Sequence, residues 1–304
     1  MTQLLNALPG ALAQGLIWGV MAIGVYITYK VLDIADLTVD GSICTGAAVC
    51  TMLLLGGQSP WLALLCAVLA GVLAGAVTGL LHVGLGIPPI LAGILTQMVL
   101  WSVNLKLLGK ANQALPARTT PVLLSQMDVG GALPVLLGFC VVLVALLVLF
   151  FGTELGCALR ATGCNPVMSR AQGVNTGLMK VVGLALSNGV VALSGALLCQ
   201  YQGYTDVNMG RGAVVIGLAA VVIGQAVLGR RGSRMAVQLG GVILGAVIYY
   251  IVYQVIIFAG FDTDLLKMFS AVVVAVFLGA PHVKAQLKAN SRSKKGDSGH
   301  AENE

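Results

Sequence analysis

Charged residues are scarce in this sequence. Asp, Glu, Lys and Arg make up 9% of its 304 residues, whereas about a quarter of the residues in a soluble domain are charged. Hydrophobic residues make up 58% of the chain, and the mean hydropathy is +0.96. This composition excludes a soluble globular protein and leaves no stretch suited to a separate soluble domain. It predicts an integral membrane protein.

Motifs for catalysis and nucleotide binding are also missing. No GxxxxGK(S/T) loop occurs, because the GKAN at Gly109 is not followed by Ser or Thr, and there is neither HExxH nor a GxSxG with a credible triad. The chain is therefore expected to have no enzymatic activity, cofactor or metal site of its own. If ATP drives its function, another chain must bind ATP and Mg and hydrolyse the nucleotide.

The cysteines form no CxxC pair, and most of them fall inside apolar runs. This placement is typical of small buried side chains and not of a metal site or a disulfide framework. The seven positions are Cys44, Cys50, Cys66, Cys140, Cys157, Cys164 and Cys199.

Long apolar runs fill most of the chain. A helix of about 20 apolar residues is long enough to cross a bilayer. The apolar runs therefore predict an all-α polytopic membrane protein with about nine transmembrane helices. The N-terminus lacks a basic region and a cleavage pattern, so the first helix is expected to be retained. Residues 1–283 are expected to form the transmembrane domain and 284–304 a disordered cytoplasmic tail near anionic lipid. The expected spans are 9–30, 38–56, 60–84, 89–105, 130–152, 178–201, 212–229, 236–258 and 264–281.

The basic residues predict the orientation of these spans. If the C-terminus is cytoplasmic, the expected spans put the N-terminus outside and place twelve of the 17 Lys and Arg residues on the cytoplasmic side. This bias is what the positive-inside rule expects, and it explains the net charge of +6 without nucleic acid as a partner. The polar stretch from Thr153 to Thr176 is then cytoplasmic.

Two short segments suggest an inverted repeat. DLTVDGS, at Asp36 to Ser42, and DVNMGRG, at Asp206 to Gly212, each combine Asp, alternating apolar residues and Gly before a Gly/Ala-rich span. The expected topology places them on opposite sides of the membrane, as in transporters whose substrate path lies between inverted halves.

A few polar side chains near or within the spans are candidates for a translocation path. Each has a simpler alternative role, which is hydrogen bonding between helices or, for the aspartates, capping of helix N-termini. The candidates are Asp36, Thr38, Asp40, Gln97, Asn104, Asn188, Asp206 and Asn208. A further segment, GIPPILAGILTQ from Gly86, predicts a tight cytoplasmic turn, with a moving hinge as the alternative.

Several separated motifs together resemble a known family. DLTVDGS, GIPPILAGILTQMVLWSVNLKLLGKAN, ELGCALRATGCNPVMSRAQGVNT and DVNMGRGAVVIGLAAVVIG occur in the order found in permease subunits of bacterial ABC importers of the branched-chain amino acid and ribose type. The similarity covers residues 10 to 282. The first two motifs look closest to a branch linked to uptake of tryptophan, tyrosine and related small solutes.

The resemblance implies a set of partners. Such permeases lie in the bacterial cytoplasmic membrane and dimerise; a homodimer is expected here. A cytoplasmic ATP-binding subunit holds ATP and Mg, and an extracytoplasmic solute-binding protein delivers the solute. The segment from Lys106 to Asp128 either receives the binding protein or serves as a linker.

The loop ALRATGCNPVMSRAQGVNT resembles the family's coupling element, a short helix that docks on the ATPase. Asn165 suits the N-cap, Pro166 the first turn and Gly173 the end of such a helix. Val167, Met168 and Ala171 would form its apolar side. Arg160 and Arg170 would either pair with acidic groups of the ATPase or only contribute to the positive-inside bias.

Two positions depart from the family pattern. Gln225 stands where members often have Glu, and Cys157 where they often have a basic or other polar residue.

The predicted function is that of an ABC importer permease that moves a small solute, such as an amino acid, inward by alternating access. The alternatives are a stand-alone secondary transporter or channel and a purely structural membrane protein.

Overall fold

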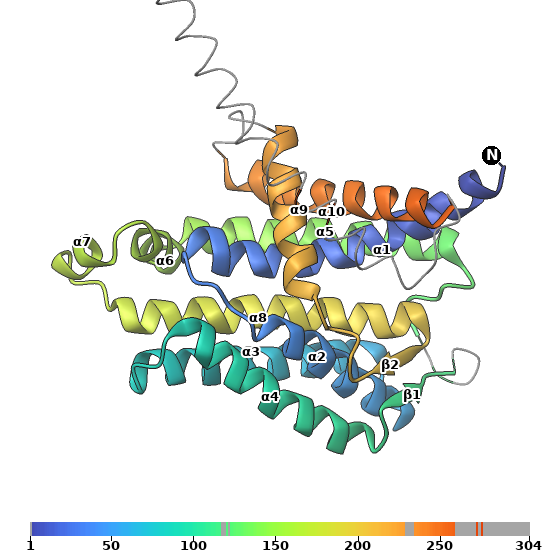
Figure 1. The fold of residues 1–304 in the computed structure, drawn as a ribbon, viewed down its shortest axis with the longest axis horizontal. Coiled ribbons are helices and arrows are strands. Elements are labelled where there is room, and N and C mark those ends of the chain that lie inside the picture. Colours follow the sequence, from blue (N-terminus) through green and yellow to red (C-terminus); the bar gives the residue numbers. More distant parts are fainter. Residues whose placement is uncertain are drawn as a thin grey trace, which may run out of the picture.

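The computed structural model describes residues 2–116, 120, 122–228, 234–258, 272 and 275. These residues form helices with one small sheet (Figure 1). The elements in chain order are α1 (Thr2–Tyr26), a π-helix η1 (Ile27–Val31), α2 (Val39–Leu55), α3 (Pro60–Gly84), α4 (Pro89–Leu108), β1 (Asn112–Ala114), α5 (Val129–Gly152), α6 (Glu154–Cys164), α7 (Pro166–Ala171), α8 (Thr176–Gln202), β2 (Tyr204–Asp206), α9 (Ala213–Leu228) and α10 (Met235–Phe258).

The helices follow the apolar runs closely. Helices form in eight of the nine expected spans, while the last, 264–281, lies outside the continuously described ranges, so the count of nine is untested. Six helices within the described ranges are long and apolar enough to cross a bilayer, which makes this a multi-pass membrane protein. The shorter apolar helices α2 and α9 have 17 and 16 residues.

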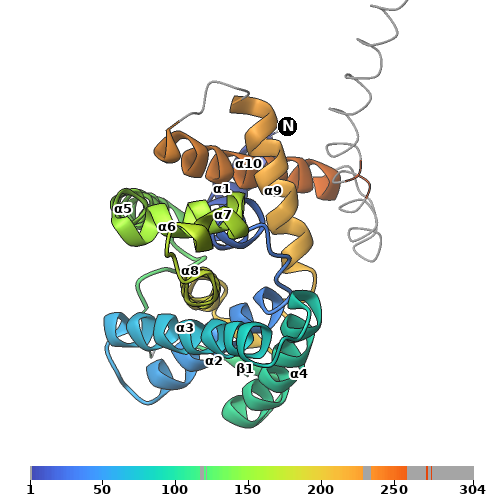
Figure 2. The same ribbon diagram turned by 90° about the vertical axis from the view of Figure 1, so that its left-hand side faces the viewer.

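Helix α9 differs from the expected transmembrane span at 212–229. In Figures 1 and 2 it runs across the direction of α5 and α8 instead of along it. Its direction is fixed by close packing against other helices: Gly217 faces Val25 of α1, and Gly224 lies against the backbone of Gly241 in α10. These contacts join residues far apart in the chain, so hydropathy alone did not predict the orientation.

Helix α8 forms the centre of the bundle. Figure 2, which looks along α8, shows it between α1 and α5 on one side and α2 and α3 on the other. Gly71, Gly75 and Gly79 of α3 all face the backbone of α8, which confirms that this glycine-rich run permits close helix approach. Gly195 of α8 in turn lies directly against the carbonyl oxygen of Ile43 in α2.

We expect a Gly195→Ala substitution to lower the free energy of unfolding by about 1 to 3 kcal/mol, because the new methyl group would push α2 and α8 apart. Gly138→Ala in α5 is the matched control, since no neighbouring atom lies within 4 Å of a Cβ built there. Thermal unfolding in detergent would compare the two variants. Equal midpoints would contradict the packing argument.

The remaining connections place the loops that matter for the site. Strands β1 and β2 pair antiparallel, with Asn112 opposite Asp206, and so bring together the loops that follow α4 and α8. At the other end of the bundle, Gly86 has a φ of +69° and Pro89 begins α4, which confirms the predicted tight turn. The helices α6 and α7 lie at this same end (Figure 1).

Candidate functional site: a polar cavity and an exposed helix

The two repeat-like segments meet each other in the fold. Asp40, in the first turn of α2, accepts hydrogen bonds from the backbone N–H groups of Gly212 and Val214, both at 3.0 Å. The two N-termini of the short helices α2 and α9 therefore converge on one carboxylate, which offsets the positive ends of their dipoles. The sequence predicted that Asp40 caps the start of a nearby helix. In the structure Asp40 caps the start of α9, and its partner Gly212 is 172 residues away in the chain.

The other two aspartates share one local geometry. Asp36 Oδ1 accepts from Thr38 N at 2.8 Å, just before α2, and Asp206 Oδ1 accepts from Asn208 N at 2.7 Å, before α9. Each carboxylate thus accepts a hydrogen bond from the N–H group two residues later, and this forms an Asx turn at the entrance to a short helix. This likeness agrees with the proposed repeat, which stays a prediction.

Asp36 belongs to a buried hydrogen-bond network between α2 and α8. Its Oδ2 accepts from Asn188 Nδ2 at 2.7 Å, and Asn188 Oδ1 accepts from Ser42 Oγ at 2.6 Å. Thr38 extends the network, because its hydroxyl lies 2.8 Å from that of Thr78 in α3. The candidates Asp36, Thr38 and Asn188 are therefore together, but inside the helix packing and not on an open surface.

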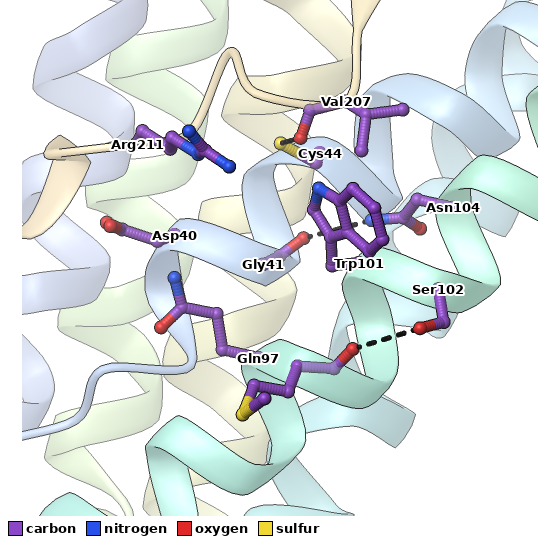
Figure 3. A pocket seen from close by; sticks show the side chains of 10 residues that line it. Asp40, Gly41, Cys44, Gln97, Trp101, Ser102, Asn104, Val207 and Arg211 are labelled. Carbon is purple, nitrogen blue, oxygen red and sulfur yellow. Dashed lines mark hydrogen bonds between the residues drawn. The ribbon is translucent and has the colours of Figure 1, made fainter. Parts of the chain in front are cut away.

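Three other candidates surround a cavity of about 440 Å³ between α2, α4 and the segment before α9 (Figure 3). Asp40 of α2 and Gln97 and Asn104 of α4 line it. Asp206 and Asn208 are not among its lining residues, although their neighbours Val207 and Arg211 are. The full lining is Asp40, Gly41, Cys44, Gln97, Met98, Trp101, Ser102, Asn104, Val207 and Arg211.

The sequence reasoning missed Trp101 and Arg211. Gln97, Trp101 and Asn104 are spaced i, i+4 and i+7, which places them on one face of a helix. That spacing was a usable signal for Trp101. Arg211 lies within DVNMGRG, but only the packing of this segment against α2 brings it to the cavity (Figure 3).

Removing the Asp40 cap should destabilise the start of α9. We expect Asp40→Ala to lower the free energy of unfolding by about 1 to 2 kcal/mol, because two backbone N–H groups lose their acceptor. Asp40→Asn keeps a side-chain oxygen and should lose less. Hydrogen exchange at residues 212–216 would report the effect locally, and unchanged protection in Asp40→Ala would contradict it.

The stretch from Thr153 to Thr176 folds into two short helices. Asn165 Oδ1 accepts from the N–H groups of Val167 and Met168 at 3.1 and 3.0 Å, Pro166 occupies the first turn of α7, and Gly173 follows with a φ of +83°. These positions confirm the local predictions. Val167 and Met168 are 74% and 62% exposed, so α7 presents apolar side chains outward.

The base of α7 is held by contacts within the chain. Arg170 Nε donates to Thr176 Oγ1 at 3.0 Å, and Arg160 Nη2 donates to the carbonyl oxygen of Phe151 at 3.1 Å. Gly163 of α6 lies directly against the backbone of Val31 in η1. Helix α7 therefore rests on α6 and α8, and α6 is in turn held by α5 and η1.

The comparisons with known proteins agree with this arrangement. A family model described as the permease component of branched-chain amino acid transport systems matches residues 8–280. The chain belongs to this permease family. A tyrosine transport system permease protein of Clostridioides difficile is 37% identical over 287 residues, which cover 93% of this permease and 94% of that protein.

Two further comparisons are more distant. The autoinducer 2 import system permease protein of Escherichia coli is 29% identical over 216 residues, covering 67% of this permease and 60% of that protein. A solved structure, an inward-facing conformation of a metal-chelate type ABC transporter, shares the fold with a TM-score of 0.52 at 14% identity, covering 91% of this permease and 85% of that chain. The family model and the Clostridioides difficile relative thus place this chain among the permease components of transport systems.

The two residues that depart from the family pattern, Gln225 and Cys157, are both exposed on helices. Gln225 is exposed near the end of α9. Cys157 is exposed on α6 and lies 3.3 Å from Arg160 Nη2. Within the described ranges, no group of three or more His, Cys, Asp or Glu residues could hold a metal ion.

Proposed function

We propose that this permease forms the transmembrane path of an ATP-driven importer and moves a small solute, an amino acid, inward by alternating access. A separate subunit would bind ATP and Mg²⁺ and hydrolyse the nucleotide, and a solute-binding protein would deliver the amino acid. Membership of the ABC permease family supports the class of transporter. The tyrosine transport permease among its relatives supports an amino acid as the solute.

The exposed helix α7 is the observation that carries the proposal. Within one turn it presents Val167 and Met168 to solvent, while its N-terminus is capped and its base is anchored. Exposed apolar side chains on a rigid support are typical of a docking site for another protein. A helix that is rigidly joined to the bundle can also transmit a movement of its partner to the membrane helices.

The distribution of charge supports a cytoplasmic position for α7. Arg160, Arg170 and Lys180 lie at the α7 end of the bundle, as the positive-inside rule expects for the cytoplasmic side. The end that carries β1 and β2 would then face outward and receive the solute-binding protein. A second copy of the permease would complete the path, as the family resemblance implies.

Purification from bacterial membranes tests the proposal. A tagged permease, extracted in mild detergent, should retain an ATP-binding subunit and its ATPase activity. The proposal would be wrong if chemical cross-linking before extraction also captured no ATP-binding subunit.

A further inference from the structure

The cavity beside α4 contains two opposite charges that do not pair with each other. The carboxylate of Asp40 is held by the N–H groups of Gly212 and Val214. The guanidinium of Arg211 is exposed, and among the described residues it has no hydrogen bond or ion pair. Figure 3 shows both side chains at the same edge of the cavity. An Arg side chain offers five N–H donors, and two of them can bind a carboxylate in a bidentate pair.

The opposite wall of the cavity is aromatic and apolar. Trp101 is 45% exposed and Met98 is 66% exposed, and both line the cavity from α4. An exposed indole provides a flat surface on which another aromatic ring can stack, and a thioether adapts to the edge of such a ring. The volume of about 440 Å³ lies within the range of small-molecule sites.

The wall also contains an unsatisfied polar group. Asn104 is fully buried and donates to the carbonyl oxygen of Gly41 at the long distance of 3.5 Å, while its Oδ1 has no hydrogen-bond partner among the described residues. An unpaired buried oxygen costs free energy and is uncommon in native proteins unless it has a role.

We propose that this cavity binds an amino acid with an aromatic side chain during transport. Arg211 binds the carboxylate of the amino acid, and Asp40 and Gln97 accept hydrogen bonds from its ammonium group. Trp101 contacts the aromatic ring. This inference rests on the proposed function and adds that the permease itself, and not only a solute-binding protein, selects the solute.

Direct binding tests the site in the absence of the solute-binding protein. The permease and its ATP-binding subunit are placed in lipid nanodiscs without nucleotide, and tritiated L-tyrosine is the probe. L-Phenylalanine should compete well. L-Alanine, tyramine and 3-(4-hydroxyphenyl)propionate should each compete about tenfold less well or worse, because each lacks one of the three recognised groups.

Substitutions at Trp101 and Arg211 test which side chain contacts the aromatic ring and which contacts the carboxylate of the amino acid. Trp101→Leu should weaken tyrosine binding about tenfold, while Trp61→Leu, a control on α3 that is 61% exposed outside the cavity, should leave it unchanged. Arg211→Gln should weaken tyrosine binding about tenfold and leave competition by tyramine unchanged, because tyramine has no carboxylate. Arg211→Lys should restore part of the loss, which a folding defect would not allow.

The possible failures are distinguishable. If tyrosine binds with saturation but neither Trp101→Leu nor Arg211→Gln weakens it, the cavity is not the site. If the wild-type complex imports tyrosine with ATP but shows no saturable binding in nanodiscs, this inference is wrong while the proposed function stands. If import does not require ATP, the proposed function itself fails.

Discussion

An Asn188→Leu variant is expected to lose about 3 to 5 kcal/mol of unfolding free energy, the largest stability effect foreseen for this permease. Asn188 provides the side-chain donor to Asp36 Oδ2, and Asp36 is only 5% exposed. Leucine has a similar size but no donor, so the substitution leaves a buried carboxylate without a partner for one of its oxygens. It also removes the acceptor of Ser42 Oγ.

Denaturant titration of the purified permease in detergent measures this loss. Ser194→Ala, on the same helix, is the control, because it removes a neutral hydrogen bond to Ile17 O and should cost about 1 kcal/mol. Adding Asp36→Asn to Asn188→Leu should recover part of the loss, because the buried group is then uncharged. If Asn188→Leu proved no less stable than Ser194→Ala, the network would not support the packing of α2 on α8.

The second large effect concerns transport and not stability. A Val167→Asp/Met168→Asp double variant should reduce ATP-driven uptake at least tenfold while leaving the fold intact. Burying an exposed aliphatic side chain against a partner contributes about 1.5 to 3 kcal/mol. Replacing both side chains with charged ones should therefore weaken docking about 100-fold or more.

Uptake, permease-stimulated ATPase activity and the unfolding midpoint should be measured together. Met127→Asp is the matched control for binding of the ATP-binding subunit and for the unfolding midpoint, but not for uptake, because Met127 is 82% exposed in the loop before α5, at the end of the bundle proposed to receive the solute-binding protein. The Val167→Asp/Met168→Asp permease should keep the unfolding midpoint of the unmodified protein, but ATP hydrolysis should no longer drive uptake. Normal coupling in the double variant would exclude α7 as the docking element.

The sequence predicted well the features that depend on neighbouring residues. Asn165, Pro166 and Gly173 define the start and end of α7 within nine residues, and the structure confirms each of these roles. The apolar runs likewise predicted where the described helices form, because length and hydropathy are local properties.

Features that depend on distant contacts were not predictable in the same way. The cap that Asp40 provides for α9 and the pairing of β1 with β2 join residues far apart in the chain. The cavity requires α2, α4 and the segment before α9 to come together, so the polar residues of the spans could not be divided in advance into cavity and core. Gln97 lines the cavity, whereas Asn188 is buried in the network with Asp36.

Uptake into liposomes tests the central claim most directly. The permease is reconstituted with its ATP-binding subunit and solute-binding protein, and accumulation of labelled L-tyrosine is measured with ATP or with an imposed ion gradient. Uptake should require ATP and the ATP-binding subunit and proceed without a gradient. Uptake by the permease alone, driven by a proton or sodium gradient, would contradict the account and identify a secondary transporter.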